Sequence, residues 1–484
     1  MGLPTTDGLA RRDFLRRGTA GLLGALALAA EEAKDKEFRL ATFSCDITPP
    51  IGHPLIAGWL PAVRKVDDPL RALGVVLLGI GRPVVLCALD WCGLGNEAFA
   101  AWQKALAESV ETSPERVAIH CLHQHDAPLV DLEARRLLEA AKAPPMFDLT
   151  YFNRVVRQTA EAARTALAKS RPLTHYGVGQ AKVERVAVNR RVRRPDGKVI
   201  NRSKPSDPGG DDPEGVIDPW LKTLSFYNGE QPLAALHYYA VHPISYYGEG
   251  SVSSEFVGLA RQKRQEDDPK VFQVYFTGAA GNLNASKYND WKHDKRPLLR
   301  DRVYQAMKAA WQATRRHPLT GWEWRTEATR FPPRREKTFS VEASRKVLED
   351  PQKRLPQRGH AALCLAWLKR IERPIALSCL DLGAALVVHL PGEPFVEYQL
   401  KAQELRKDAF VCLAGYGDYG PMYIPTDKAY QEGGYELTVA HEGPSEELLY
   451  RKLARLLQGT TREDTSSTKR PNDARGHGGV WVGR

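Results

Sequence analysis

Val117-Ala118-Ile119-His120-Cys121-Leu122 is a largely apolar run that ends at His123-Gln124-His125. A run of this kind is typical of a strand that is buried on both faces. Alternate side chains of an extended chain point the same way, so His123 and His125 would face the same point. Imidazole nitrogens are common zinc donors. The pattern therefore predicts a metal-binding pair after a buried strand, although a random pair at this spacing is also common.

Two distant segments repeat this arrangement. Val241-His242-Pro243 follows one apolar run, and Leu390-Pro391-Gly392-Glu393 follows another. In α/β folds, sites are assembled from segments that follow the carboxyl ends of strands. A catalytic zinc needs three or four such donors and one open position. Taken singly, His242 could be a hydrogen-bonded core histidine and Glu393 an acidic residue at the start of a helix near Phe395.

The remaining sequence predicts an α/β fold with mixed β-sheets flanked by helices. The chain has 484 residues, of which 43% are hydrophobic, enough for the core of a single large domain. Apolar spacing predicts strands at 72–78, 83–90, 117–122, 221–227, 232–240, 271–276, 376–382 and 384–390, and helices at 96–108, 132–143, 148–169, 298–313 and 342–349. Residues 195–215 are rich in Pro, Gly, Asp and Lys, which predicts a loop.

The two ends of the chain read as segments outside this domain. Arg11-Arg12-Asp13-Phe14-Leu15-Arg16-Arg17 precedes a short apolar stretch that ends at Ala27-Leu28-Ala29. This combination predicts a twin-arginine signal peptide over residues 1–30 and a periplasmic or extracellular protein. The alternative, a membrane anchor, would need about 20 apolar residues, and the stretch is shorter. Residues 459–484 are polar and glycine-rich, which predicts a disordered tail.

Charge and cysteine content exclude some functions. The formal charge of +11 is spread along the chain, so no nucleic-acid partner is expected. The one dense run, Arg190-Arg191-Val192-Arg193-Arg194, is typical of a solvated face and could steer an anionic substrate. The seven cysteines lie mostly in apolar runs without paired spacing, which predicts packed thiols and no disulfide framework.

A family resemblance connects these segments. It rests on six motifs: Asp46-Ile47-Thr48-Pro49-Pro50, Leu122-His123-Gln124-His125-Asp126-Ala127-Pro128, Val188-Asn189-Arg190, Ala240-Val241-His242-Pro243-Ile244-Ser245, Ala280-Gly281-Asn282-Leu283-Asn284 and Leu390-Pro391-Gly392-Glu393. In this order they resemble the catalytic domain of neutral/alkaline non-lysosomal ceramidases. The resemblance implies a ceramidase-type zinc hydrolase domain over residues 38–458.

The same resemblance implies roles for particular residues. It assigns zinc to His123, His242, Glu393 and Tyr423, and the family's second tyrosine, twelve residues later, is Tyr435. It further makes Tyr435 a candidate donor to the oxyanion, His125 a proton shuttle or orienting group, and Arg190 a binder of a polar or anionic part of the substrate. The implied reaction is cleavage of a linear amide (N-acyl, ceramide-like) or an ester by a zinc-activated water. The implied partners are a small-molecule or lipid substrate and the surface of a membrane.

The chain departs from the family pattern in two places. Asn284 stands where the family has a catalytic serine, and an amide cannot act as an alkoxide, although it can orient a water or donate to an oxyanion. The family's immunoglobulin-like C-terminal domain would also find no room before Arg484.

Three alternatives stay open beside this interpretation. The chain could be a zinc-containing exported binding protein without catalysis, or its metal site could be structural. An amidohydrolase-type barrel also begins with His-x-His, but it needs eight β/α repeats that the sequence does not show.

Overall fold

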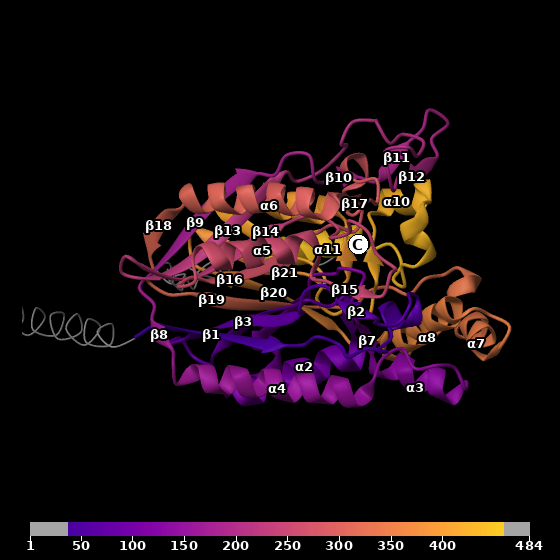
Figure 1. The fold of residues 1–484 in the computed structure, drawn as a ribbon, viewed down its shortest axis with the longest axis horizontal. Helices are drawn as coiled ribbons and strands as arrows, with labels where there is room; N and C mark the ends of the chain where they lie inside the picture. Colours follow the sequence, from indigo (N-terminus) through magenta and orange to yellow (C-terminus); the bar gives the residue numbers. More distant parts are fainter. Residues whose placement is uncertain (1–36, 459–484) are drawn as a thin grey trace, which may run out of the picture.

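The computed structural model describes residues 37–458. The predicted signal peptide (1–30) and tail (459–484) lie outside the described residues, so both stay predictions. The described part folds around three sheets of four or five strands, with helices on the outside (Figure 1). The predicted fold class, mixed β-sheets flanked by helices in one large α/β domain, is confirmed.

The first two sheets each combine antiparallel and parallel neighbours. One has the order β6-β4-β3-β1-β8, and the other β16-β14-β13-β9-β18. Their bounds are β1 Arg39–Asp46, β3 Arg71–Leu78, β4 Val84–Leu89, β6 Val117–Cys121 and β8 Arg171–Pro172, then β9 His175–Lys182, β13 Trp220–Asn228, β14 Gln231–Tyr239, β16 Phe272–Thr277 and β18 Arg315–Pro318. β4 is parallel to β6, and β14 is parallel to β16.

The third sheet has the order β19-β20-β21-β23. Its bounds are β19 Glu323–Thr329, β20 Ile375–Asp381, β21 Ala385–His389 and β23 Phe410–Ala414. Here β21 is parallel to β23. All three sheets therefore contain a parallel pair, whose two carboxyl ends lie at the same edge.

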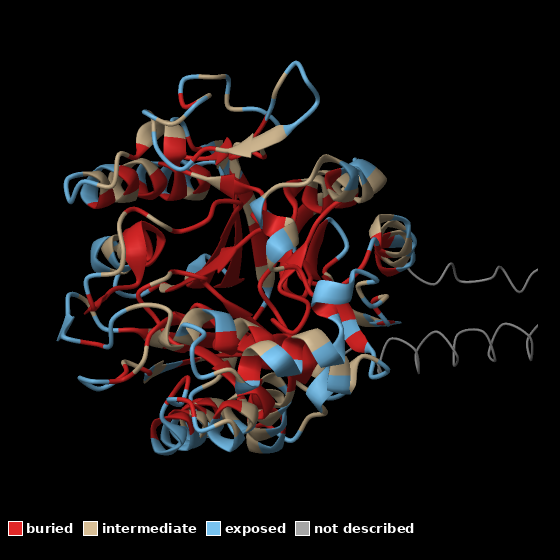
Figure 2. Ribbon diagram, turned by 90° about the vertical axis from the view of Figure 1, so that its right-hand side faces the viewer, coloured by how far each residue is buried: buried red, intermediate tan, exposed pale blue. Residues whose placement is uncertain are grey.

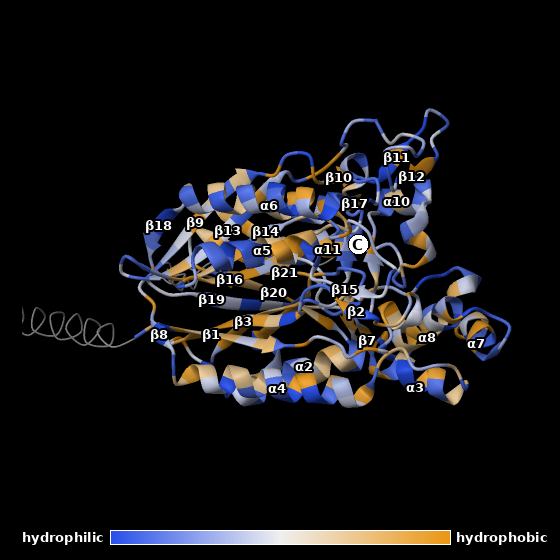
Figure 3. Ribbon diagram, in the orientation of Figure 1, coloured by the Kyte–Doolittle hydropathy of each residue, from blue (hydrophilic) through white to orange (hydrophobic). Residues whose placement is uncertain are grey.

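Helices cover the outer faces of this assembly. They are α2 Asn96–Ser109, α3 Leu132–Ala140, α4 Leu149–Leu167, α5 Glu255–Asp267, α6 Lys295–Gln312, α7 Val341–Glu349, α8 Leu355–Arg370, α9 Val396–Leu405, α10 Asp427–Glu432 and α11 Glu446–Gln458. In Figure 1, α5 and α6 lie above the strands and α2 and α4 below them. Buried residues fill the interior between these layers (Figure 2), and α4 shows an apolar and a polar side (Figure 3).

Alternation along the strands divides the core. In β4, Val85, Cys87 and Leu89 pack with residues of α2 and α4, whereas Val84, Leu86 and Ala88 pack with residues of the second and third sheets. Both faces of this strand are thus buried, as its continuous apolar sequence predicts.

Among residues 37–458, none of the helices combines the length and the hydrophobicity that a membrane-spanning helix needs.

Short paired strands gather beyond the carboxyl ends of the parallel pairs, at the right of Figure 1. They are β2 Lys65–Val66 with β15 Ser251–Val252, β5 Gly93–Gly95 with β7 Leu129–Asp131, β10 Val188–Asn189 with β17 Leu283–Asn284, β11 Arg191–Arg193 with β12 Val199–Asn201, and β22 Glu393–Pro394 with β24 Tyr423–Ile424. Most of the residues predicted for the site lie in or beside these short strands.

Candidate metal centre

The three predicted metal-binding segments meet at this end of the molecule. His123 follows β6, His242 follows β14, and Glu393 begins β22 shortly after β21. The His-x-His segment follows the buried strand, as predicted, but it is not extended as expected, because β6 ends at Cys121 and His123 has a φ of 73°. A left-handed backbone costs free energy in a residue with a side chain, and such strain often occurs at functional sites.

One carboxylate oxygen and two imidazole nitrogens form the centre. Glu393 Oε2 lies 3.2 Å from His123 Nε2 and 3.5 Å from His242 Nε2. All three side chains are almost fully buried. Glu393 Oε2 and His242 Nε2 have no hydrogen-bond partner among the described residues. Buried polar atoms without a partner are costly, which indicates that these atoms serve a group from outside the chain.

The opposite nitrogen of each imidazole fixes its orientation. His123 Nδ1 lies 2.6 Å from the Cys92 carbonyl oxygen, and His242 Nδ1 lies 3.2 Å from that of Ala280. A carbonyl oxygen only accepts, so each Nδ1 carries the proton and donates it. Each Nε2 can therefore present a lone pair, the arrangement that metal-binding histidines adopt.

The distances from the carboxylate oxygen to the two imidazole nitrogens suit a tetrahedral metal ion such as zinc. Tetrahedral donors at about 2.0–2.1 Å from zinc would be separated by roughly 3.4 Å. The distances of 3.2 and 3.5 Å from Glu393 Oε2 to the two nitrogens bracket this value. A third imidazole is close as well, since ligand atoms of His123, His125 and His242 all lie within 4.8 Å of one another. The cluster could hold a metal ion.

Charge at the centre favours a cation. Burial lowers the pKa of His123, but the neighbouring Glu393 carboxylate and Cys92 thiol together raise it to about 10. Without a metal this imidazole therefore carries a second proton, on Nε2, which metal binding would release. Burial, together with the nearby His123, holds the pKa of His242 well below its usual range. His242 is thus a neutral imidazole, the form in which histidine binds metals.

Tyr419 holds the metal-facing carboxylate, and sequence reasoning missed it. Its hydroxyl donates to Glu393 Oε1, which leaves Oε2 for the centre. Tyr416, three residues earlier, stacks on the ring of His123 with 4.5 Å between ring centroids. Both tyrosines are buried in the segment that follows β23. Only the residues Tyr-Gly-Asp-Tyr mark this segment in the sequence, and that signal is weak.

Tyr423 lies next to Glu393, because the two are register partners in the parallel pair β22–β24. Its ring faces Arg190, with the guanidinium carbon 5.3 Å from the ring centroid. Burial raises the pKa of Tyr423 well above its usual range, and the positive charge of Arg190 cancels only part of this rise. The structure thus places Tyr423 beside the centre, and its role as fourth ligand stays a prediction.

Arg190 and Arg191 do not lie on a solvated face, so that interpretation of the arginine run was wrong for these two residues. Arg190 Nε donates to Glu436 Oε1 at 2.8 Å, and Arg191 Nη1 donates to Glu436 Oε2 at 2.7 Å. Glu436 is fully buried, and Arg190 is nearly so. The Glu436 carboxylate offsets one of these two positive charges, and Glu432 Oε2 lies 3.6 Å from Arg191 Nη2. Such pairing matters because an unpaired buried charge would be strongly destabilising. Arg193 is exposed nearby and approaches Glu432, and the partly buried Arg194 approaches Asp212.

A cavity of about 370 Å³ brings the other predicted residues together. His125, Arg190, Asn284, Tyr423 and Tyr435 all contribute to its wall. Tyr435 stands at the rim with 48% of its surface exposed. In the structure, the predicted catalytic and substrate-binding residues thus surround one cavity. Their individual roles remain predictions.

The side chain of Asn284 is committed to the backbone around this cavity. Its Nδ2 donates to the Arg202 carbonyl at 3.0 Å, and its Oδ1 accepts from Ser286 N at 3.0 Å. Asn284 thus connects the strand β17 to the predicted loop 195–215. One amide hydrogen is left over for a ligand or a water.

The cysteines behave as predicted. All seven are free, and all but Cys45 are buried. Cys92 contributes to the centre through its carbonyl oxygen, a backbone role that its side-chain type could not indicate.

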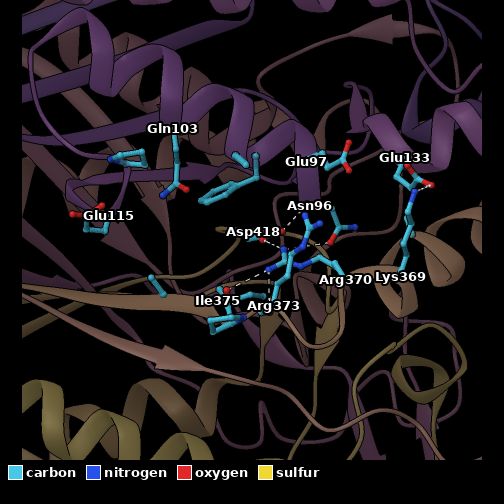
Figure 4. Close-up of a pocket in the computed structure, with 16 residues that line it drawn as sticks. Asn96, Glu97, Gln103, Glu115, Glu133, Lys369, Arg370, Arg373, Ile375 and Asp418 are labelled. Atoms are coloured by element: carbon cyan, nitrogen blue, oxygen red, sulfur yellow. Dashed lines mark hydrogen bonds and ion pairs between the residues drawn. The ribbon is translucent and has the colours of Figure 1, made fainter.

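A separate cavity, also of about 370 Å³, lies between α2 and α8 (Figure 4). None of the predicted site residues lines it. Four of its charged groups form two ion pairs, Arg370 with Asp418 and Lys369 with Glu133.

Fold and site together define a mixed α/β protein with a candidate metal centre at the ends of its strands. The neutral ceramidase from Pseudomonas aeruginosa has a similar solved structure, with a TM-score of 0.61 and 17% sequence identity over 87% of this chain and 74% of that one. A structure described as a ceramidase complexed with C2 gives a TM-score of 0.63 and 17% identity over 87% and 75% of the two chains. At this identity the likeness shows the fold.

No protein-family model matches the chain. No curated protein matches it either.

Proposed function

We propose that the protein is a zinc-dependent hydrolase that cleaves a linear amide or an ester. The observation that carries the proposal is the set of buried donors without partners, His242 Nε2 and Glu393 Oε2, which converge with His123 Nε2 at tetrahedral spacing. A zinc ion held there would act as a Lewis acid, polarising a carbonyl group and lowering the pKa of a water toward about 7. The ceramidase fold supports amide cleavage as the reaction class.

The chain's own residues can supply the rest of the chemistry. His125 reaches both the centre and the cavity, which suits a group that accepts a proton from water and returns it to the leaving amine. Tyr435 carries a phenol at the rim, and burial raises its pKa, so the hydroxyl stays protonated at neutral pH and can donate to an oxyanion. Arg190 packs against Tyr423 and Tyr435 and holds both rings in place.

The remaining parts of the proposal concern location and partners. We propose that the protein is exported through the twin-arginine pathway and acts in the periplasm or outside the cell. Its substrate would be a small molecule or a lipid, reached without a nucleic-acid partner. The motif in residues 11–17 supports export.

Metal analysis followed by a hydrolysis screen tests the proposal. The purified protein should contain about one zinc per chain, and a chelator should abolish the cleavage of N-acyl amides or acyl esters. His123→Ala and His242→Ala should each lose the zinc, whereas His175→Ala, at a histidine outside the centre, should keep it. Full zinc occupancy in the His123/His242 double variant would contradict the assignment. Zinc-loaded protein that cleaves nothing in a broad panel would instead support a binding protein.

A pair of variants identifies the last ligand. If Tyr423 completes the shell, Tyr423→Phe should lower zinc affinity more than His125→Ala does. The reverse order would make His125, the third imidazole of the cluster, the ligand and Tyr423 a neighbour.

A further inference from the structure

The imidazole of His125 is surrounded by three other rings. Those of His123 and His242 lie edge-on to it, with 5.4 and 5.6 Å between ring centroids. The ring of Tyr247 is nearer, at 4.9 Å and an interplanar angle of 75°. Contacts of this kind orient rings, because the positive edge of one ring meets the negative face of the other. Since His123 and His242 are candidate metal ligands, Tyr247 is the ring that holds His125 from outside the centre.

Tyr247 belongs to a segment without helix or strand, so other contacts hold it in place. The segment covers residues 240–250, between β14 and β15. The Tyr246 carbonyl accepts a hydrogen bond from Arg296 Nη2 at 2.9 Å. The ring of Tyr247 also packs against that of Trp291, with 5.0 Å between ring centroids. The backbone is thus fixed on the N-terminal side of Tyr247.

Asp126 holds the same segment on the C-terminal side of Tyr247. Its Oδ1 accepts a hydrogen bond from Gly248 N at 3.0 Å. Asp126 is 2% exposed, so this bond lies in a medium of low polarity, where hydrogen bonds are stronger than in water. Asp126 directly follows His125 in the chain. The bond therefore connects the backbone beside the imidazole to the backbone beside the ring that packs on it.

We propose that Asp126 and Tyr247 position His125 for proton transfer. Asp126 anchors the segment, and the Tyr247 ring keeps the imidazole in one orientation. The proposal rests on the proposed function, in which His125 accepts a proton from water and returns it to the leaving amine. A positioned acid or base contributes about 10²–10⁴ in rate, so an imidazole that turns freely should lose part of this factor.

Two substitutions at Asp126 separate this role from a chemical role of the carboxylate. Its Oδ2 has no partner among the described residues, so the carboxylate could itself accept a proton. Asp126→Asn keeps an oxygen that can accept from Gly248 N, and Asp126→Ala removes it. For N-acetylsphingosine in mixed micelles, the Asn variant should keep kcat within about twofold, and the Ala variant should lose about tenfold or more. Equal losses in the two variants would overturn the proposal.

Tyr247 offers a second matched pair. Tyr247→Phe keeps the ring that packs on His125, and Tyr247→Leu removes it. On the same substrate, we expect Tyr247→Phe to keep kcat within about twofold and Tyr247→Leu to lose about tenfold. An equal loss in both variants would show that the phenol hydroxyl is what matters, which would contradict the proposal.

A second substrate shows whether proton transfer is the step affected. N-acetylsphingosine must release an amine, which needs a proton, whereas p-nitrophenyl acetate releases an ion that is stable without one. Asp126→Ala and Tyr247→Leu should therefore lower kcat for the amide about fivefold more than for the ester. A general loss of structure would lower both alike, so equal losses for the two substrates would refute a positioning role.

The NMR signal of the His125 ring separates this proposal from the proposed function, because it needs no turnover. In protein with ¹³C-labelled histidine, the signal is identified by its loss in His125→Ala. It should be single in the wild type and in Asp126→Asn, and broadened or split in Asp126→Ala and Tyr247→Leu. If the wild type cleaves neither substrate, the hydrolase proposal fails, and this signal decides whether the imidazole is positioned. A single signal in all variants would overturn the proposal.

Discussion

Some side chains around the centre would bind the metal directly, and others position those ligands through hydrogen bonds. Tyr419 is of the second kind, since it binds the oxygen of Glu393 that faces away from the two histidines. Such outer partners are typically worth 10- to 100-fold in metal affinity. Without the phenol, both carboxylate oxygens could approach the metal, and the carboxylate could rotate.

We therefore expect Tyr419→Phe to lower zinc affinity about 10- to 100-fold. Competition with a chromophoric chelator measures this directly. Tyr398→Phe is the matched control, because it removes another buried hydroxyl, one that donates to the Pro425 carbonyl at 2.9 Å away from the centre. Equal zinc affinities of the two variants would show that Tyr419 does not position Glu393.

Asn284 gives a second prediction at this scale. If the proposed hydrolase uses water as its nucleophile, the wild type is active, and Asn284→Ser should shift substrate preference without creating activity. If a serine hydroxyl is essential, the wild type should be inert on ceramide-like amides, and Asn284→Ser should gain about 10²–10³ in rate. We expect the first result, because the amide is already used to bind Arg202 and Ser286. Steady-state kinetics on amides and esters distinguishes the two.

At the scale of elements, the predicted loop 195–215 is held in place by one buried arginine. Arg202 is 1% exposed and donates to the carbonyl oxygens of Asn189, Gly209, Asp212 and Pro213. Lys287 adds bonds to the carbonyl of Asp212 from the other side. This segment forms one wall of the cavity, so its order and the shape of the cavity depend on the same contacts.

Arg202→Lys should loosen this wall. Lysine keeps the charge but cannot reach several carbonyl groups at once, because its ammonium is a single point. We expect faster proteolytic cleavage within 195–215 and weaker substrate binding, with zinc content unchanged. Lys287→Arg, at a partly buried cation that bonds the same loop, serves as the comparison. Wild-type proteolysis of Arg202→Lys would refute a clamping role.

The sequence predicted those elements whose apolar residues follow a regular period. The hairpin of β3 and β4, the hairpin of β13 and β14, and the helices α2 and α4 all match their predicted positions within a few residues. Helix α8 was missed because Ala361 to Trp367 are all buried, which removes the one-sided pattern of a surface helix. Helix α5 was missed because its apolar residues lie in its first half and its second half is charged.

The sequence likewise predicted only part of the candidate site. Its side-chain donors could be found from residue type and from their position after strands. The carbonyl groups of Cys92 and Ala280 could not be predicted as partners of the imidazoles, because every residue has a carbonyl group. Only the folded chain brings these two close to His123 and His242. The pairing of Arg190 with Glu436 spans 246 positions, a distance over which a sequence pattern carries no signal.

For the whole molecule, buried histidines make stability depend on pH. Burial lowers the pKa of His53, His120 and His237 to about 4 in each case. In the unfolded chain histidine titrates near 6.5. Their contribution to stability is thus fully present above about pH 6.5 and is lost as the pH falls through 4. His237 is the best probe, since it bonds Thr223 in β13 and Gln273 in β16.

The free energy of unfolding of the wild type should therefore approach that of His237→Gln as the pH falls. Between pH 7 and pH 4 the difference should shrink by roughly 3 kcal/mol, because each pKa unit corresponds to about 1.36 kcal/mol. Denaturant titrations at several pH values measure this quantity. Parallel curves for the two proteins would show that His237 does not titrate during unfolding.

The separation of the candidate ligands along the chain has a consequence for biosynthesis. His123, His242 and Glu393 belong to segments that follow three different sheets, and no two are neighbours in sequence. Contacts between residues so distant form slowly, because long loops must close first. A ribosome-bound chain cannot assemble the centre before residue 393 has left the exit tunnel, and the α2–α4 side of the molecule can fold earlier. Metal uptake would thus be among the last steps of maturation. In a pulse-labelling experiment, the time at which the labelled chain first binds zinc would mark the completion of the fold.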